Sequence, residues 1–254
     1  MKKTIAVINQ KGGVGKTTIS INLSGGLAIT GNKRVLLIDL DPQANTTFNF
    51  GIIPEEIQYG IHDVLMDRVR AESAIIKTKI KNLDLIPTNS HLDRAEQLLL
   101  QATYREERLK RALRDLDYDY IIIDCRPTLS TLTLNAMVVA DLILVPIIMD
   151  RYSLYGFNDL LNSLQSIKSV DPHFSLDNSL RILLNAIDLR EKVVPELVIK
   201  DLEEVRHLIL NTQIRKSSDF KKTQYSDIPL LAMETKPTKS VEDYISLTNE
   251  IINL

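Results

Sequence analysis

The chain has 254 residues, of which 44% are hydrophobic, 25% charged and 5% aromatic, and 31 Lys and Arg against 33 Asp and Glu give a net charge of −2. These are globular proportions, which exclude collagen-like, disordered and disulfide-scaffold chains. Because Cys125 is the only cysteine, one subunit cannot form a disulfide or hold a metal or iron–sulfur cluster through cysteines, as is typical of the reducing cytoplasm. The longest apolar stretch, 136–149, is too short to span a bilayer and the N-terminus has no signal-peptide pattern, so we expect a cytoplasmic protein.

Short β-branched runs alternate with longer amphipathic ones, which predicts a doubly wound α/β fold with a mostly parallel sheet covered by helices on both faces. The predicted strands are Thr4–Asn9, Arg34–Ile38, Leu83–Ile86, Tyr120–Ile123, Leu142–Pro146, Arg181–Asn185 and Gln213–Ile214. The predicted helices are Thr17–Thr30, Ile61–Asp67, Leu92–Leu116, Thr131–Ala140, Ser153–Ser169, Val193–Asn211 and Ser240–Ile252. Neither a repeat nor a linker interrupts this pattern, so we expect a single domain over residues 1–254.

The first predicted strand leads directly into a glycine-rich segment and then into a helix. Glycine leaves room for backbone N–H groups to surround phosphate oxygens, and the helix adds the positive end of its dipole. Lys16 is expected to bind the β- and γ-phosphates, and the Thr17 hydroxyl to bind Mg²⁺. An ordinary turn does not require Gly-Lys-Thr-Thr here, so the sequence predicts a nucleotide-binding loop formed by Gly12, Gly13, Val14, Gly15, Lys16, Thr17 and Thr18.

The loop departs from the general pattern G-x-x-x-x-G-K-[ST], because Gln10 stands where the first glycine belongs and a lysine follows it. The string Lys11-Gly12-Gly13-Val14-Gly15-Lys16-Thr17-Thr18 resembles the deviant phosphate loop of the ParA/MinD family. The resemblance extends from Thr4 to Ile252 and implies a Mg²⁺-dependent ATPase of the P-loop NTPase fold, in which two subunits enclose two ATP molecules. It also implies that Lys11 reaches the partner's nucleotide and is catalytic together with Lys16, as an arginine finger is. A solvated loop lysine is the alternative for Lys11.

The second predicted strand is followed by Asp39 and Asp41, at the carboxyl end of a central strand where open α/β sheets bind ligands. Side chains alternate along an extended chain, so both carboxylates can face the same side. The segment resembles one of the family in which the second aspartate orients the attacking water and the first supports the metal. Asp41 would then be catalytic and Asp39 would lie at the magnesium site, although Asp41 is also a plausible turn former before Pro42.

The strand Tyr120–Ile123 ends in Asp124, the position of the second metal-supporting carboxylate of phosphate-loop enzymes. Residues 118–129 resemble the corresponding family segment, which usually has two prolines where this chain has Arg126 and Pro127. Arg126 could tune hydrolysis, contact a second subunit or be an ordinary surface arginine. By resemblance, Asn185 and Pro229 contact adenine, and a loop-capping role is the alternative for Asn185.

The branches of the family act on different partners. MinD-type members dock on anionic membranes through a basic C-terminal helix, whereas residues 240–254 contain acids and no Lys or Arg, so we expect no membrane binding. The ParA branch, which remains, binds DNA without sequence preference as an ATP-bound homodimer, and a ParB-type centromere-binding partner stimulates its slow hydrolysis. We therefore expect a nucleoid-associated partition ATPase for a plasmid or chromosome. With nine residues before Gln10, we expect no N-terminal helix-turn-helix domain.

Two other functions stay open. One is a MinD-like or cargo-positioning ATPase that acts on a membrane or a protein assembly instead of DNA, and a more remote one is a small-molecule kinase or synthetase. DNA binding requires clustered cations. The segment from Asn211 to Gln224 contains four cationic residues and one acidic residue. The expected DNA contacts are Arg215, Lys216, Lys221 and Lys222. A solvated run of charge is the alternative.

Overall fold

The structure is a computed structural model, and it describes residues 2–150, 157, 160–162, 164, 175–188, 190, 198–220, 227–233 and 238–254. Most of the predicted helix Ser153–Ser169 lies outside these residues, and so do Lys221 and Lys222.

An eight-stranded sheet forms the centre of the molecule, in the order β3-β4-β2-β5-β1-β6-β7-β8. Each pair of neighbouring strands is parallel except β3 and β4. The doubly wound α/β fold is therefore confirmed. The strands are β1 (Lys3–Val7), β2 (Val35–Leu40), β3 (Ile76–Lys77), β4 (Leu83–Ile86), β5 (Tyr120–Cys125), β6 (Leu142–Ile148), β7 (Leu180–Ile187) and β8 (Ile209–Arg215).

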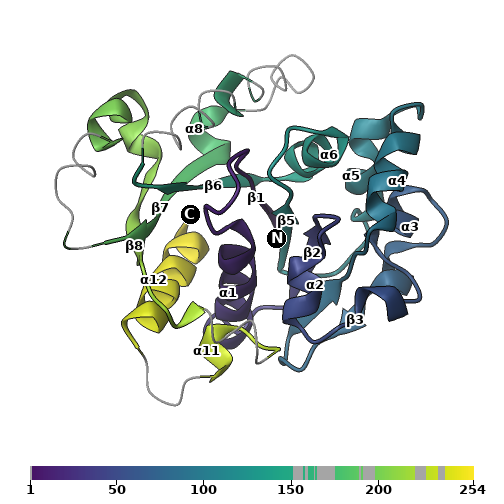
Figure 1. The fold of residues 1–254 in the computed structure, drawn as a ribbon, viewed down its shortest axis with the longest axis horizontal. Helices are drawn as coiled ribbons and strands as arrows, with labels where there is room; N and C mark the ends of the chain where they lie inside the picture. Colours follow the sequence, from purple (N-terminus) through teal and green to yellow (C-terminus); the bar gives the residue numbers. More distant parts are fainter. Residues whose placement is uncertain are drawn as a thin grey trace.

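Helices cover both faces of the sheet (Figure 1). One face is covered by α1 (Lys16–Ile29), α11 (Leu230–Met233) and α12 (Lys239–Asn253), and the other by α3 (Ile61–Leu65), α4 (His91–Leu99), α5 (Arg108–Ala112), α6 (Thr131–Val139) and α8 (Leu176–Ser179). The short helix α2 (Asn45–Asn49) follows β2, and 3₁₀ turns lie at Pro54–Glu56, Ala71–Ala74, Arg105–Glu107 and Glu203–Leu208. Alternate residues of each central strand enter the two cores: Ile5 and Val7 lie on the α1 side, and Ala6 and Ile8 on the α6 side.

Two predicted helices are wrong in extent. The stretch Leu92–Leu116 is divided into α4 and α5, because Tyr104 between them has a φ of 52°, which no α-helix accommodates. The stretch Val193–Asn211 ends too late, since Ile209 begins strand β8. In both places the amphipathic spacing continues beyond the point where the backbone leaves the helical region.

Helix α12 begins at Lys239, one residue before the predicted start, and the Thr238 hydroxyl accepts the Val241 N–H at its N-terminus. Its apolar residues Tyr244, Leu247 and Ile251 are fully buried in the core on the α1 side. The apolar face of this helix is therefore occupied by the protein's own sheet. Within the described ranges, no helix combines the length and the apolar character that crossing a bilayer requires.

Candidate nucleotide-binding site

The glycine-rich segment joins β1 to α1 through two left-handed residues. Gly13 has a φ of 76° and Gly15, the N-cap of α1, a φ of 90°. A Cβ atom on Gly15 would lie 2.4 Å from Nδ2 of Asn185, so only glycine fits there. This conformation directs the chain into the first turn of α1, whose N–H groups have no helical partners and favour anions.

Lys16 lies beneath this loop. Its Nζ donates to the carbonyl oxygen of Lys11 at 3.0 Å, and the residue is 7% exposed. Burial lowers the pKa of Lys16, and the nearby charge of Asp124 opposes that shift. A buried ammonium that spans the loop is placed to meet phosphate oxygens bound in it.

Lys11 is bound to its own subunit at the start of the loop. Its Nζ donates to Oδ1 of Asp150 at 2.6 Å, just beyond the end of β6. The Lys11 N–H donates to Oδ1 of Asn9 at 2.9 Å, and Nδ2 of Asn9 donates to the Pro146 carbonyl at 2.8 Å. The loop is therefore attached to β6 through both a side-chain and a backbone contact.

Asp39 and Asp124 lie opposite each other on the neighbouring strands β2 and β5. Both are buried, with exposures of 0% and 1%. Burial, together with the charge of Asp124, raises the pKa of Asp39 to about 8, and burial raises the pKa of Asp124 to about 6. Two adjacent buried carboxylates are unfavourable unless a cation neutralises them, and oxygen ligands of this kind suit Mg²⁺.

Hydroxyl groups hold the two carboxylates in place. Thr46 Oγ1 donates to Oδ2 of Asp124 at 2.7 Å and Ser20 Oγ donates to its Oδ1 at 3.1 Å. Thr17 also hydrogen-bonds Asp124, and Thr47 Oγ1 donates to Oδ2 of Asp39 at 2.7 Å. Ser20, Thr46 and Thr47 are not among the residues predicted from the sequence, although the Thr-Thr pair soon after the acidic segment was a usable signal. No group of three or more His, Cys, Asp or Glu converges among the described residues, so a divalent ion here would take further oxygens from phosphates and water.

Asp41 forms a turn in this structure. Its Oδ1 accepts the Gln43 N–H at 3.0 Å, and its carbonyl accepts the Ala44 N–H at 2.8 Å. Its charge is close enough to raise the pKa of Asp124 and to oppose the lowering of the Lys16 pKa. The structure therefore brings Asp41 to the same site while using its carboxylate as a cap.

The two predicted adenine contacts lie in different places. Asn185 Nδ2 donates to the Val14 carbonyl at 2.7 Å and so caps the phosphate loop. Pro229 packs against Gly25, and the next residue, Leu230, donates its N–H to Oδ1 of Asn22 at 2.8 Å. Gly25 and Asn22 belong to the middle of α1, so the structure does not bring Pro229 to the loop.

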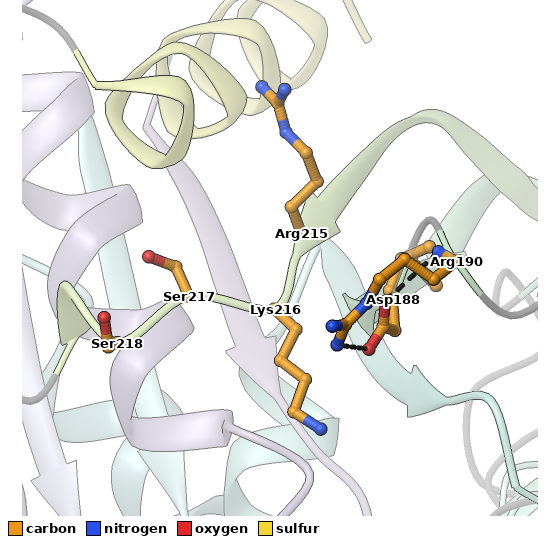
Figure 2. A pocket seen from close by; sticks show the side chains of 7 residues that line it. Asp188, Arg190, Arg215, Lys216, Ser217 and Ser218 are labelled. Atoms are coloured by element: carbon orange, nitrogen blue, oxygen red, sulfur yellow. Dashed lines mark hydrogen bonds and ion pairs between the residues drawn. The ribbon is translucent and has the colours of Figure 1, made fainter.

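A cavity of about 550 Å³ lies instead at the carboxyl ends of β7 and β8, two residues beyond Asn185 (Figure 2). Arg190 and Asp188 pair with each other across its wall, with Nη2 and Oδ2 2.6 Å apart. The Arg215 guanidinium extends towards α12, where its Nη2 donates to Oδ1 of Asp243 at 2.6 Å. The cavity is lined by Ile187, Asp188, Arg190, Arg215, Lys216, Ser217 and Ser218.

The predicted DNA contacts therefore differ in availability. Arg215 is neutralised by Asp243, whereas Lys216 is exposed at the rim of the cavity. Arg126, which the sequence left open, is held within the subunit: its Nη1 donates to Oε2 of Glu96 at 2.8 Å and to Oδ1 of Asp93 at 3.1 Å.

Comparison with known proteins identifies relatives over the whole chain. A family described as an AAA domain matches residues 2–182. "Sporulation initiation inhibitor protein Soj" of Bacillus subtilis is 36% identical, over 99% of this chain and 98% of its own length, and "Chromosome partitioning protein ParA" of Caulobacter vibrioides is 34% identical, over 99% and 94%. Among solved structures, cobyrinic acid a,c-diamide synthase from Mycobacterium smegmatis with bound ADP and magnesium is 30% identical, with a TM-score of 0.84 over 100% of this chain and 95% of that one.

Proposed function

Because this chain belongs to the ParA/MinD family of AAA-type P-loop ATPases, we propose that it is a partition ATPase that dimerises around two ATP molecules, binds DNA in that state and is released by hydrolysis. The observation that carries the proposal is the alignment of Asp39 with Asp124 on neighbouring strands, on the same side of the sheet as Lys16. A buried acid pair beside a phosphate loop is the arrangement that a Mg²⁺-nucleotide requires. The names of relatives that match nearly the full chain favour partition over other uses of ATP.

In the proposed complex the phosphates occupy the loop formed by residues 12–18, in contact with Lys16. Thr17, Asp39 and Asp124 hold Mg²⁺, which when bound neutralises charge on the β- and γ-phosphates. The solved structure that binds ADP and magnesium supports both ligands. The cavity beyond Asn185 is a better place for the base than the surroundings of Pro229, because it lies at the carboxyl ends of parallel strands, where ligands of such folds bind.

Hydrolysis requires two residues to leave the positions they have in this subunit. Lys11 must exchange the carboxylate of Asp150 for the nucleotide of the second subunit, and Asp41 must release the Gln43 N–H to orient water. Both changes oppose turnover by a single subunit. This arrangement supports the proposal that hydrolysis is slow until a ParB-type partner favours the competent dimer.

DNA, not a membrane, is the proposed anchor. The apolar face of α12 is buried, and two of its acids, Asp243 and Glu250, bind groups of β8. An amphipathic membrane helix needs both that face and a basic side free. Lys216 is the proposed DNA contact among the described residues, and Lys221 and Lys222 are proposed from the sequence alone; DNA binding would place the protein in the cytoplasm on the nucleoid.

Co-sedimentation tests this function. The protein should sediment with random-sequence DNA in ATP and Mg²⁺, not with ADP, and should remain in the supernatant with anionic vesicles. Lys11→Gln should bind ATP but lose DNA binding and partner-stimulated turnover. Sedimentation with vesicles alone would favour the MinD-like alternative, and ATP-independent sedimentation with DNA would contradict the proposed switch.

A synthetase is the second candidate, because a solved structure that is 30% identical over the whole chain bears the name of an amide-forming synthase. Such an enzyme hydrolyses ATP only when it has an acceptor molecule. ATP turnover that DNA and a ParB-type protein leave unchanged, but that a carboxylic acid substrate with an amine donor stimulates, would favour this candidate.

A further inference from the structure

One carboxylate on α4 holds both ends of the loop 126–130, which joins β5 to α6. At the start of the loop, Arg126 Nη1 donates to Oε2 of Glu96 at 2.8 Å. At its end, the backbone N–H of Leu132 in the first turn of α6 donates to Oε1 of Glu96 at 3.3 Å. The two oxygens of Glu96 therefore tie the loop to α4.

The Thr133 hydroxyl of α6 donates to the Thr128 carbonyl of the loop, but two other polar side-chain atoms of the loop have no partner among the described residues. Ser130 is the N-cap of α6 but makes no side-chain cap bond. In the described part of the chain, Ser130 Oγ and Arg126 Nε are buried without a hydrogen-bond partner, and each such atom costs about 1–3 kcal/mol. Glu96 replaces the missing cap, and its charge is favourable beside the N-terminus of α6. Its side chain is only 15% exposed, so salt screens this contact less than a surface pair.

The position of the loop connects this contact to the nucleotide site. Arg126 is two residues from Asp124 along the chain, and it directly follows the last residue of β5. Asp124 is fixed on its other side by Ser20 and Thr46.

We propose that Glu96 is a positioning residue that acts through Arg126 to place the loop 126–130, and with it Asp124, against the phosphate loop. It would thereby set the Mg²⁺ affinity of the nucleotide-bound protein and the rate of hydrolysis. This inference rests on the proposed function, because it assumes that Asp124 supports the magnesium that accompanies ATP. Glu96 acts through its contacts with Arg126 and the Leu132 N–H.

Glu96→Gln is the primary variant, because it keeps the shape of the side chain and removes the charge. We expect the Mg²⁺ concentration for half-maximal binding of a fluorescent ATP analogue to rise about tenfold, as for residues that orient metal ligands. Hydrolysis should fall in parallel, binding without Mg²⁺ should not change, and the Leu132 amide should exchange hydrogen faster. Arg126→Gln should behave alike, and the double variant should be no worse than either single one. Asp93→Asn is the control, because Asp93 contacts the same guanidinium from a position 53% exposed and should matter little.

Two results would overturn the inference. If the Leu132 amide of Glu96→Gln exchanges hydrogen faster but nucleotide binding keeps the parental Mg²⁺ dependence, the contact of Glu96 is only structural. If the effects of Glu96→Gln and Arg126→Gln add, Glu96 does not act through Arg126. The proposed function is contradicted by a different result. If the parental protein shows no Mg²⁺-dependent nucleotide binding, both proposals are wrong. If the parent binds normally and Glu96→Gln has the same Mg²⁺ dependence, only the inference about Glu96 is wrong.

Discussion

The Lys11 ammonium is bound to the Asp150 carboxylate of the same subunit, with Nζ 2.6 Å from Oδ1. The two residues are 139 positions apart in sequence, and their side chains are 25% and 36% exposed. Lys11 is the residue proposed to reach the partner's nucleotide, so this ion pair competes directly with dimer formation. The free energy of the Lys11–Asp150 ion pair is lost once in each subunit when the dimer forms, so it weakens association.

Asp150→Asn should therefore strengthen the ATP-bound dimer. A partly exposed pair contributes about 0.5–1 kcal/mol, and breaking two of them corresponds to a dimer Kd lowered about 5- to 30-fold in the variant. Sedimentation velocity with a non-hydrolysable ATP analogue measures this. Asp117→Asn, which removes an exposed partner of Arg34 near the amino ends of β2 and β5, is the control. A weaker dimer for Asp150→Asn would mean that Asp150 positions Lys11 and does not restrain it.

Gly15→Ala should destabilise the protein without any ligand. A left-handed alanine costs about 1–2 kcal/mol, and its Cβ would also displace the Asn185 amide from the Val14 carbonyl. The melting temperature should fall by about 4 °C or more for a domain of this size. Gly12→Ala is the matched control, because nothing lies within 4 Å of a Cβ at Gly12. Equal losses for the two variants would contradict the loop geometry.

The stability of the metal-free protein should depend on pH through Asp39. Burial and Asp124 raise the pKa of Asp39 from 3.8 to about 8, so the folded state prefers the protonated form. The associated stability is complete below about pH 4 and is lost as the pH rises towards 8. The melting temperature of Asp39→Asn relative to the parent should accordingly increase by about 3 °C or more between pH 5 and pH 9.

Magnesium with a non-hydrolysable ATP analogue should remove that advantage, because it stabilises the charged pair in the parent and not in the variant. If the difference in melting temperature between Asp39→Asn and the parent stays constant over the pH range, the pKa of Asp39 is not raised by burial beside Asp124.

Lys216 and Arg215 should contribute differently to DNA binding. Lys216→Ala should weaken DNA binding and lower the slope of log K against log salt by about 0.9, the value for one phosphate contact. Arg215→Ala should instead lower stability by about 1–3 kcal/mol, because the buried Asp243 carboxylate keeps the backbone N–H of residue 215 but loses its cation. Filter binding over a salt series and thermal unfolding separate the two effects. If Arg215→Ala lowered the salt slope more than Lys216→Ala, Arg215 would contact DNA and would not be held by Asp243 of α12.

The strands and the phosphate loop were predictable because their determinants are local. Continuous apolar runs such as Ile121–Ile123 form central strands, and the glycines and lysine of the loop are contiguous. Asp39 and Asp124 were predictable for the same reason, since each directly follows a strand core. Their alignment on neighbouring strands then follows from the order of the sheet.

The remaining features depend on contacts between distant segments, which a single sequence does not show. Nothing near Asp150 indicates that it binds Lys11, and nothing near Glu96 indicates that it holds Arg126 and the N–H of Leu132. The left-handed Tyr104 ends a helical pattern that the residue spacing would continue. Pro229 packs against Gly25 of α1, a contact that its neighbours in sequence do not indicate.

A mixture of two inactive variants, Lys11→Gln and Asp41→Ala, tests whether Lys11 acts in the site of the partner subunit. In a mixed dimer, the site of the Lys11→Gln subunit keeps its own Asp41 and receives Lys11 from the other subunit, so one of two sites is complete. Random mixing in equal amounts should restore about one quarter of the parental partner-stimulated ATPase rate. If mixed dimers form, as differently tagged subunits would show, and no activity returns, Lys11 acts within its own subunit and the account is contradicted.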